Sequence, residues 1–304
     1  MTSLSFKTLE SRCKMNLEEY FKRIGFHGPF DKLDLATLNS VHKQHIMSVP
    51  FENLSIHCGE KIIMDLEVIF NKIVRSNRGG WCLENNYLFG WVLREMGFDT
   101  TTLSSKVFNS ISNEFGPYDS HLINKIVIDR KAYIADVSFG VSSQIRETLE
   151  LVSGKDQPQA AGVFRVIDKG DMWVLEKTGR KPQVLNPELT NSSLVNRNDT
   201  KQIYSFTLVP REVDHFRDVS DKLQTDPASL FTNKSILSLQ TPTGFKALVG
   251  WTYSEVTYKP EEGVDVIDMR DVTDDEIEPI LREKFNLKLQ NKLKPVSNKA
   301  WYTL

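Results

Sequence analysis

The hydrophobic pattern of this 304-residue chain changes its period near residue 100. Before that point, apolar residues recur at helical spacing over 35–47 and 83–96. After it, β-branched and apolar residues dominate 100–107 and 121–128, which is typical of strands. We therefore predict an α+β fold in which a helical lobe precedes a β-rich lobe, followed by a mixed α/β last third.

Other segments carry the same signals more locally. Asn16 and Glu19 stand at capping-box spacing and Gly25 follows, so a helix is expected between Asn16 and Gly25. Further helices are expected over 65–76 and 274–285, and strands over 132–137, 163–167, 172–176, 203–209, 235–240 and 246–252. The polar stretch 178–201, with its two prolines, is predicted to be a long surface loop.

Composition limits the classes of protein that the chain can represent. Its cysteines, Cys13, Cys58 and Cys82, are sparse and lack paired or zinc-type spacing, which favours a reducing compartment and no metal site. The net charge of -2 gives no general basic surface for nucleic acid or membrane. We expect a soluble, cytoplasmic, monomeric protein with a small-molecule or protein substrate.

The first fourteen residues lack the apolar core of a secretory signal, and no apolar run is long enough to span a bilayer. This segment is interpreted either as a frayed extension or as the remnant of an alternative start.

The run RGGWCLENN, at 78–86, marks a candidate nucleophile. Cys82 follows two glycines and is expected in the first turn of a helix, where free backbone N–H groups and the helix dipole favour a thiolate. The competing interpretation is a buried structural cysteine, because free cysteine is among the most buried residue types.

A cysteine nucleophile needs a base, and the base needs an acceptor that orients it. His121 begins a predicted strand, and Asp136 ends the strand expected to pair with it. Each alone has a structural explanation as a core histidine or a turn aspartate. The ordered set Cys82, His121 and Asp136 is a stronger signal than any one member, and we predict it as a catalytic triad.

These residues and their surroundings resemble the arylamine N-acetyltransferases, in particular the vertebrate enzymes. His121 follows Cys82 by 39 residues and precedes Asp136 by 15, as in that family. The matching runs are VPFENL (49–54), SIHCG (55–59), RSNRGGWC (75–82), YIADVSFG (133–140), SGKDQPQ (153–159), IYSFTLVPR (203–211) and SLQTPTG (238–244).

The resemblance implies three parts around a cysteine-protease-like core: a helical bundle (1–98) with the nucleophile, a β-barrel (99–215) with the histidine and aspartate, and an α/β lid with the C-terminal tail (216–304). It also implies ping-pong chemistry without a permanently bound cofactor. Acetyl-CoA would acetylate Cys82, and the acetyl group would pass to an aromatic amine, a hydrazine or an N-hydroxyarylamine. Glu52 and Arg78 would pair to shape the loop before the nucleophile.

The same resemblance suggests the substrate contacts. Coenzyme contacts are expected from Gly116, Pro117, Tyr118, Ser120, His121, Lys222, Ser229 and Trp301. Lys222 would meet a phosphate or else be a solvated surface lysine. The acceptor pocket is expected to include Phe51, Ser120, His121, Phe139, Val141 and Ser143. Since some relatives have arginine and tyrosine at the positions of Val141 and Ser143, a wider pocket is expected here.

Two other interpretations remain open. A Cys-His-Asp order also fits transglutaminase-like and other thiol hydrolases. The second interpretation is a non-catalytic homologue that binds CoA or a partner. Such a homologue would be expected to have lost a member of the triad, and here all three residues are present.

Overall fold

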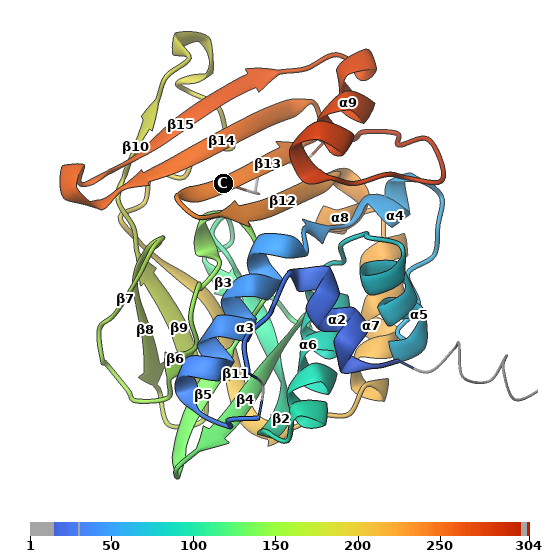
Figure 1. Cartoon of the computed structure of the whole chain (residues 1–304). Coiled ribbons are helices and arrows are strands. Elements are labelled where there is room, and N and C mark those ends of the chain that lie inside the picture. The colour runs from blue at the N-terminus through green and yellow to red at the C-terminus, as the bar shows by residue number, and fades with distance from the viewer. Residues whose placement is uncertain (1–14, 30, 299–302) are drawn as a thin grey trace, which may run out of the picture.

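Helices form the first part of the chain in the computed structural model, which describes residues 15–29, 31–298 and 303–304 (Figure 1). They are α2 (Leu17–Ile24), α3 (Leu35–Ser48), α4 (Leu54–His57), α5 (Leu66–Phe70), the π-helix η1 (Asn71–Arg75) and α6 (Cys82–Met96). The side chain of Asn16 caps α2, and Gly25 ends it with a φ of 65°. The predicted helical lobe is thereby confirmed.

A nine-stranded, nearly closed barrel follows, in the order β6-β5-β4-β2-β11-β9-β8-β7 with β3 paired to β2. Its strands are β2 (Asp99–Asn109), β3 (Glu114–Phe115), β4 (His121–Ile128), β5 (Lys131–Ala135), β6 (Leu149–Glu150), β7 (Gln157–Gln159), β8 (Gly162–Asp168), β9 (Trp173–Thr178) and β11 (Thr200–Pro210). The predicted hairpin between β4 and β5 is confirmed. Because α6 packs against β2 and β4, the helical lobe and the barrel share one core.

A second, six-stranded sheet lies above the barrel in Figure 1, in the order β1-β12-β13-β14-β15-β10. Its strands are β1 (Phe51–Glu52), β10 (Lys181–Val184), β12 (Ile236–Thr241), β13 (Gly244–Val249), β14 (Thr252–Lys259) and β15 (Val264–Asp271). Helix α9 (Asp274–Phe285) covers part of it through a separate apolar cluster. Two edge strands therefore come from earlier in the chain than residue 216, and the boundaries at 98/99 and 215/216 stay a prediction.

Several segments differ from the sequence expectation, among them strands β14 and β15, which it did not include. The expected loop 178–201 contains β10, which pairs in parallel with β15, and the short helix η3 (Pro187–Leu189). Helix α7 (Asp214–Thr225) was not predicted from the sequence. Its buried residues are Phe216, Ser220 and Gln224, and since only Phe216 is apolar, the helix has no clear hydrophobic pattern. The remaining short helices are η2 (Val141–Ser143), α8 (Leu230–Asn233) and η4 (Pro260–Glu262).

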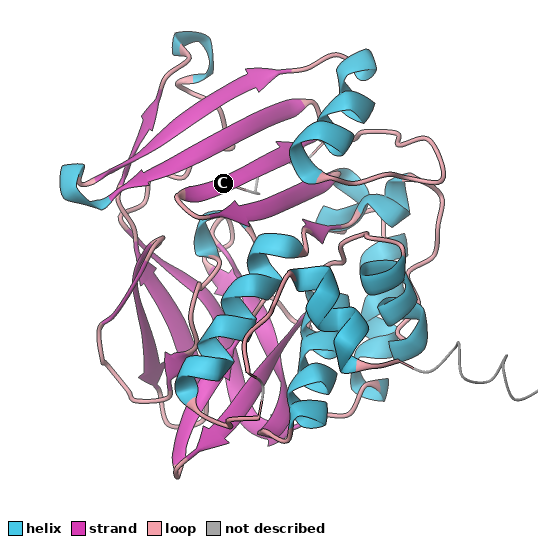
Figure 2. Cartoon of the chain, in the orientation of Figure 1, coloured by secondary structure: helices cyan, strands magenta, loops and turns pink. Residues whose placement is uncertain are grey.

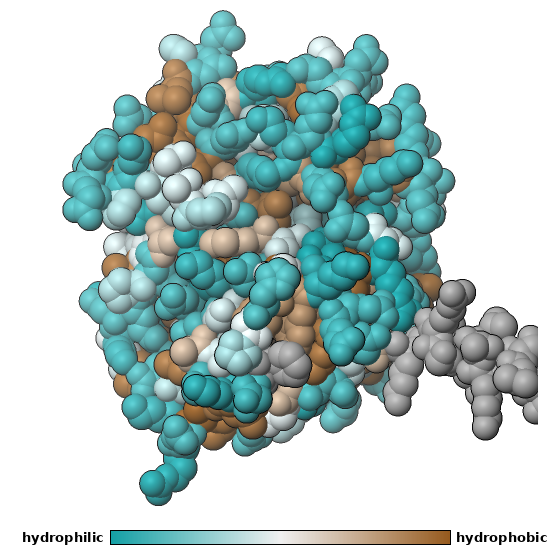
Figure 3. Space-filling model, in the orientation of Figure 1, coloured by the Kyte–Doolittle hydropathy of each residue, from teal (hydrophilic) through white to brown (hydrophobic). Residues whose placement is uncertain are grey.

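Figure 2 shows most of the helices gathered in the lower right part of the view, with α9 on the second sheet and short helical turns at the ends of its strands. Hydrophilic side chains predominate on the face drawn in Figure 3, with hydrophobic ones in smaller groups between them. None of the helices formed by the described residues has the length and apolar character needed to cross a bilayer.

Candidate active site

Cys82 is the first residue of α6, as the sequence predicted, and its side chain is almost fully buried. The two glycines before it are needed for close packing. A Cβ atom on Gly79 would lie 2.3 Å from the carbonyl oxygen of Pro50, and one on Gly80 would lie 2.8 Å from Cβ of Glu84. The Sγ atom of Cys82 lies 3.6 Å from the carbonyl oxygen of Ser120, the residue directly before His121.

The barrel brings His121 and Asp136 together beside this cysteine. Nε2 of His121 lies 2.7 Å from Oδ2 of Asp136, and both side chains are buried. Cys82 is also close enough to His121 for its side chain to act on the imidazole. Since Asp136 engages Nε2, Nδ1 is the ring nitrogen left for the thiol. The three residues predicted from the sequence are therefore neighbours, in the order cysteine, imidazole and carboxylate.

The charges around His121 favour its protonated form. Burial alone would lower its pKa, but the negative charges of Asp136 and Cys82 raise the pKa of His121 to about 10. For Asp136, burial acts in the opposite direction and would raise the pKa. The charge of His121 and the hydrogen bonds to the Asp136 carboxylate outweigh burial and hold that pKa below its usual range. The arrangement thus stabilises an imidazolium beside the Asp136 carboxylate.

Asn86 holds Asp136 in place, and the sequence reasoning missed it. Its Nδ2 donates to Oδ1 of Asp136 at 2.8 Å, and its Oδ1 accepts from the N–H of Val137 at 2.8 Å. The N–H of Ser138 donates to the same carboxylate oxygen at 3.0 Å. A signal for Asn86 was present, because it lies four residues after Cys82 and so on the same face of the helix.

Two aromatic rings flank the imidazole. The ring centroids of Phe139 and Tyr204 each lie 5.2 Å from that of His121, and the two rings also contact each other at 5.7 Å. Tyr204 is fully buried on β11, and its hydroxyl carries no hydrogen bond that satisfies normal geometry. It lies within a run quoted from the sequence, but nothing local pointed to its place beside His121.

Two buried ion pairs shape the loop that leads to Cys82. Arg78 Nε lies 2.8 Å from Oε1 of Glu52, as the sequence comparison implied, and Oε1 also accepts the N–H of Gly79 at 3.2 Å. Lys72 Nζ lies 2.9 Å from Oε1 of Glu84, whose Oε2 accepts the N–H of Trp81 at 3.2 Å. Glu84 therefore fixes the backbone just before the nucleophile.

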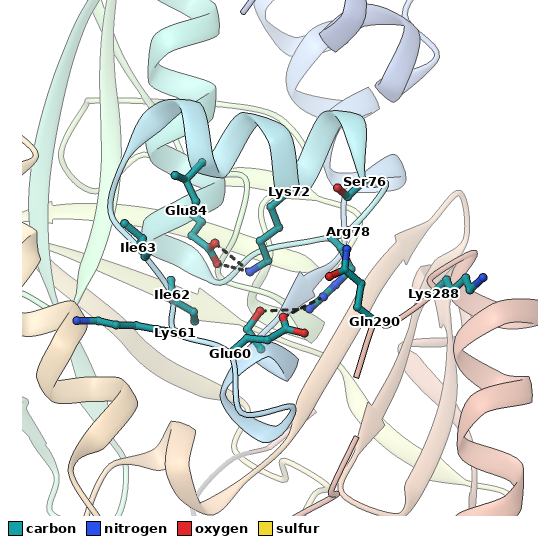
Figure 4. Close-up of a pocket in the computed structure, with 12 residues that line it drawn as sticks. Glu60, Lys61, Ile62, Ile63, Lys72, Ser76, Arg78, Glu84, Lys288 and Gln290 are labelled. Carbon is teal, nitrogen blue, oxygen red and sulfur yellow. Dashed lines mark hydrogen bonds and ion pairs between the residues drawn. The ribbon is translucent and has the colours of Figure 1, made fainter. Parts of the chain in front are cut away.

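A cavity of about 230 Å³ lies behind this loop (Figure 4). Lys72, Arg78 and Glu84 line it together with the exposed Lys61 and Lys288. Neither Cys82 nor His121 borders it, so the cavity lies at the polar back of the turn before Cys82.

The candidate coenzyme residues lie on two facing segments. Gly116, Pro117, Tyr118 and Ser120 belong to the connection between β3 and β4, which leads into His121. Lys222 extends from α7 and lies over the ring of Tyr118, 4.1 Å from its centroid, and it also donates to the Tyr118 hydroxyl. Ser229 caps α8, where its hydroxyl accepts the N–H of Phe231. Trp301 lies outside the described residues.

The candidate acceptor residues come from both sheets. Phe51 is on β1, and a Cβ atom on Gly140 would lie 3.4 Å from its ring. Phe139 packs on His121, and the turn η2, which begins two residues later, contains Val141 and Ser143. Phe51, His121 and the 139–143 segment are therefore neighbours, and Ser120 lies beside Cys82.

Comparison with known proteins decides the family. The model of the N-acetyltransferase family matches residues 34–294. A pineal gland arylamine N-acetyltransferase isozyme, NAT-10, of Gallus gallus is 50% identical over 95% of this chain and 100% of its own length. Arylamine N-acetyltransferase 2 of Mus musculus is 44% identical with the same coverage. This chain belongs to the arylamine N-acetyltransferase family.

Solved structures of the family share the fold. The Nocardia farcinica arylamine N-acetyltransferase superposes with a TM-score of 0.75 at 27% identity, covering 91% of this chain and 90% of that one. A Mycobacterium smegmatis N-arylamine acetyltransferase gives 0.77 at 25% identity, covering 90% and 93%. The predicted α+β architecture and the assignment as an acyltransferase are thus confirmed.

Proposed function

We propose that this family member transfers an acetyl group from acetyl-CoA to aromatic amines through a thioester on Cys82. The observation that carries the proposal is the grouping of the Cys82, His121 and Asp136 side chains. Sγ of Cys82 lies 3.6 Å from the carbonyl oxygen of the residue before His121, and Nε2 of His121 lies 2.7 Å from Asp136. An imidazolium held by a buried carboxylate favours the thiolate form of a neighbouring cysteine, and the thiolate is the nucleophilic form.

In the first half-reaction, the Cys82 thiolate attacks the carbonyl carbon of the acetyl thioester. The bond from that carbon to the coenzyme sulfur breaks, and the His121 imidazolium supplies the proton with which coenzyme A leaves as a thiol. Negative charge develops on the acetyl oxygen, and the N–H of Cys82, unpaired at the start of α6, is suited to stabilise it.

In the second half-reaction, the amine nitrogen attacks the acetyl carbon of the thioester. His121, now neutral, accepts the amine proton, and the bond between carbon and Sγ of Cys82 breaks. The products are an amide and the restored thiolate and imidazolium. Asp136 stays ionised throughout and keeps the imidazole oriented.

The coenzyme would lie along the segment 116–120 and against Lys222 and Ser229, with Trp301 as a further contact. Lys222 is exposed at the surface, where it can reach a coenzyme phosphate once it leaves Tyr118. The acceptor would occupy the space beside Phe51, Phe139, Val141 and Ser143, and aromatic walls suit an aryl ring. Hydrazines and N-hydroxyarylamines are acceptors of the same chemistry.

The enzyme is further proposed to act as a cytoplasmic monomer. Both cysteines that the structure describes, Cys58 and Cys82, are free thiols, and a reducing compartment preserves them in that form. Size-exclusion chromatography with light scattering tests the monomer, and fractionation of cells tests the compartment.

A matrix of acyl-CoA donors against arylamine and hydrazine acceptors tests the function. We expect acetylated arylamine only when donor and acceptor are both present, parallel lines in double-reciprocal plots, and no turnover by Cys82→Ala. Turnover retained in that variant would remove the thioester mechanism. Hydrolysis of acetyl-CoA or of an amide without transfer to an amine would instead identify a thiol hydrolase.

A further inference from the structure

The turn beside His121 contains a strained residue. Val141 has a φ of 41°, in the left-handed region that a β-branched side chain rarely adopts, and its side chain is buried. Such a conformation persists only where surrounding contacts impose it. The contacts that hold the segment 139–143 therefore matter for the shape of the site.

Three side chains hold this turn, two of them from other elements and the third, Gln144, from its own end. Lys177 Nζ, on barrel strand β9, donates to the carbonyl of Ser142 at 2.6 Å. Gln240 Nε2, on β12 of the second sheet, donates to the carbonyl of Val141 at 2.9 Å. Gln144 Oε1 accepts the N–H groups of Phe139 at 2.9 Å and Gly140 at 3.1 Å. The barrel and the second sheet thus each donate one hydrogen bond to the turn.

Lys177 is an unusual group for this task, because its side chain is buried inside the barrel. Burial lowers its pKa well below the usual range, and so do the nearby charges of Lys201 and Arg180, while Asp265 acts in the opposite direction. A buried amine without a hydrogen-bond partner is costly, and the Ser142 carbonyl is its acceptor. The lysine is therefore placed to hold one carbonyl of the turn.

The 139–143 segment also forms one wall of the candidate site. Phe139 contacts the imidazole of His121, and Gly140 lies against Phe51. Releasing the Ser142 carbonyl would let Val141 relax toward negative φ and shift the adjoining residues 139 and 140. Such a shift would move the aromatic wall beside His121, while Cys82 and the segment 116–120 stay where they are.

We propose that Lys177 is a positioning residue for the second half-reaction, in which the acceptor amine meets the acetyl-enzyme. The proposal rests on the function proposed above. Lys177 holds the 139–143 turn and thereby the acceptor side of the site. It has no role at the coenzyme side.

Half-reaction kinetics test the proposal with matched variants. Lys177→Met keeps length and removes the donor, and Gln240→Met releases the same turn from the second sheet. Lys169→Met, in the exposed connection between β8 and β9, is the control. In the first two variants we expect transfer from acetyl-enzyme to arylamine to fall about tenfold in kcat/KM, since a small misplacement at a site has effects of this size. Acetylation of Cys82 by acetyl-CoA should change less than about twofold.

Hydrogen–deuterium exchange decides the positional claim independently of any activity. Amides of the 139–145 segment should exchange faster in Lys177→Met and Gln240→Met than in the wild type, and at the wild-type rate in Lys169→Met. Unchanged exchange in Lys177→Met, equal losses in both half-reactions, or the same defect in Lys169→Met would overturn the proposal. Failure of the wild type to form an acetyl-enzyme would refute the proposed function, and the exchange rates would still decide whether Lys177 holds the turn.

Discussion

The carboxylate of Asp136 lies 2.7 Å from Nε2 of His121, and its second oxygen accepts a hydrogen bond from Asn86. This contact fixes which ring nitrogen faces the cysteine, and it gives the imidazolium a buried counter-charge. The proposed chemistry depends on that charge more than on the shape of the aspartate.

Replacing Asp136 by asparagine keeps the shape and removes the charge. We expect kcat to fall by roughly 10³-fold or more, as in other triads that lose the orienting carboxylate. Thermal unfolding in parallel should show that the fold is retained. An activity within about tenfold of the wild type would show that the carboxylate charge is not required.

The charge pair also makes stability depend on pH. The pKa of His121 is raised in the folded state to about 10 from about 6.5. Its contribution is therefore complete below pH of about 6.5, declines as the pH rises, and is absent above about 10. Urea unfolding of the wild type and His121→Asn across this range should show the difference between them shrinking with rising pH. A constant difference would contradict the assignment.

Asp136 produces the opposite trend at acid pH. Its folded pKa is lowered, so its contribution is present above its ordinary pKa and is lost as the pH falls through the folded value. In the same unfolding series, this appears as a loss of wild-type stability at low pH that Asp136→Asn does not share.

The buried pair of Glu52 and Arg78 should be structural. Removing one partner in Arg78→Met leaves a buried carboxylate unpaired, and we expect a loss of roughly 3–5 kcal/mol in the free energy of unfolding. The double variant with Glu52→Gln should lose less than the sum of the single variants. Arg165→Met, in an exposed pair with Asp156, serves as the control and should unfold like the wild type.

Lys222 should act on the coenzyme's phosphates. In Lys222→Gln we expect KM for acetyl-CoA to rise about two- to fivefold, the range of an exposed charge contact. KM for S-acetylpantetheine, which has no phosphate, should stay unchanged. An equal effect on the two donors, or none on either, would leave Lys222 as a solvated surface lysine.

Local signals in the sequence predicted much of the site. The two glycines and the apolar run after them predicted that Cys82 starts a helix. The change of period predicted the strand that begins at His121 and the strand that Asp136 directly follows. Long-range contacts left no such signal. Strand β10 is only four residues long and pairs with β15 about eighty residues later. Lys177 on β9 and Tyr204 on β11 reach the site only through the curvature of the barrel, which no local pattern encodes.

The most direct test of the account is the intact mass of the protein after incubation with acetyl-CoA in the absence of an acceptor. We predict a mass increase of one acetyl group, mapped by peptide digestion to Cys82, absent in Cys82→Ala and removed when an arylamine is added. No adduct, an adduct on another residue, or an adduct that arylamine does not discharge would contradict the role of Cys82 as the acetyl carrier.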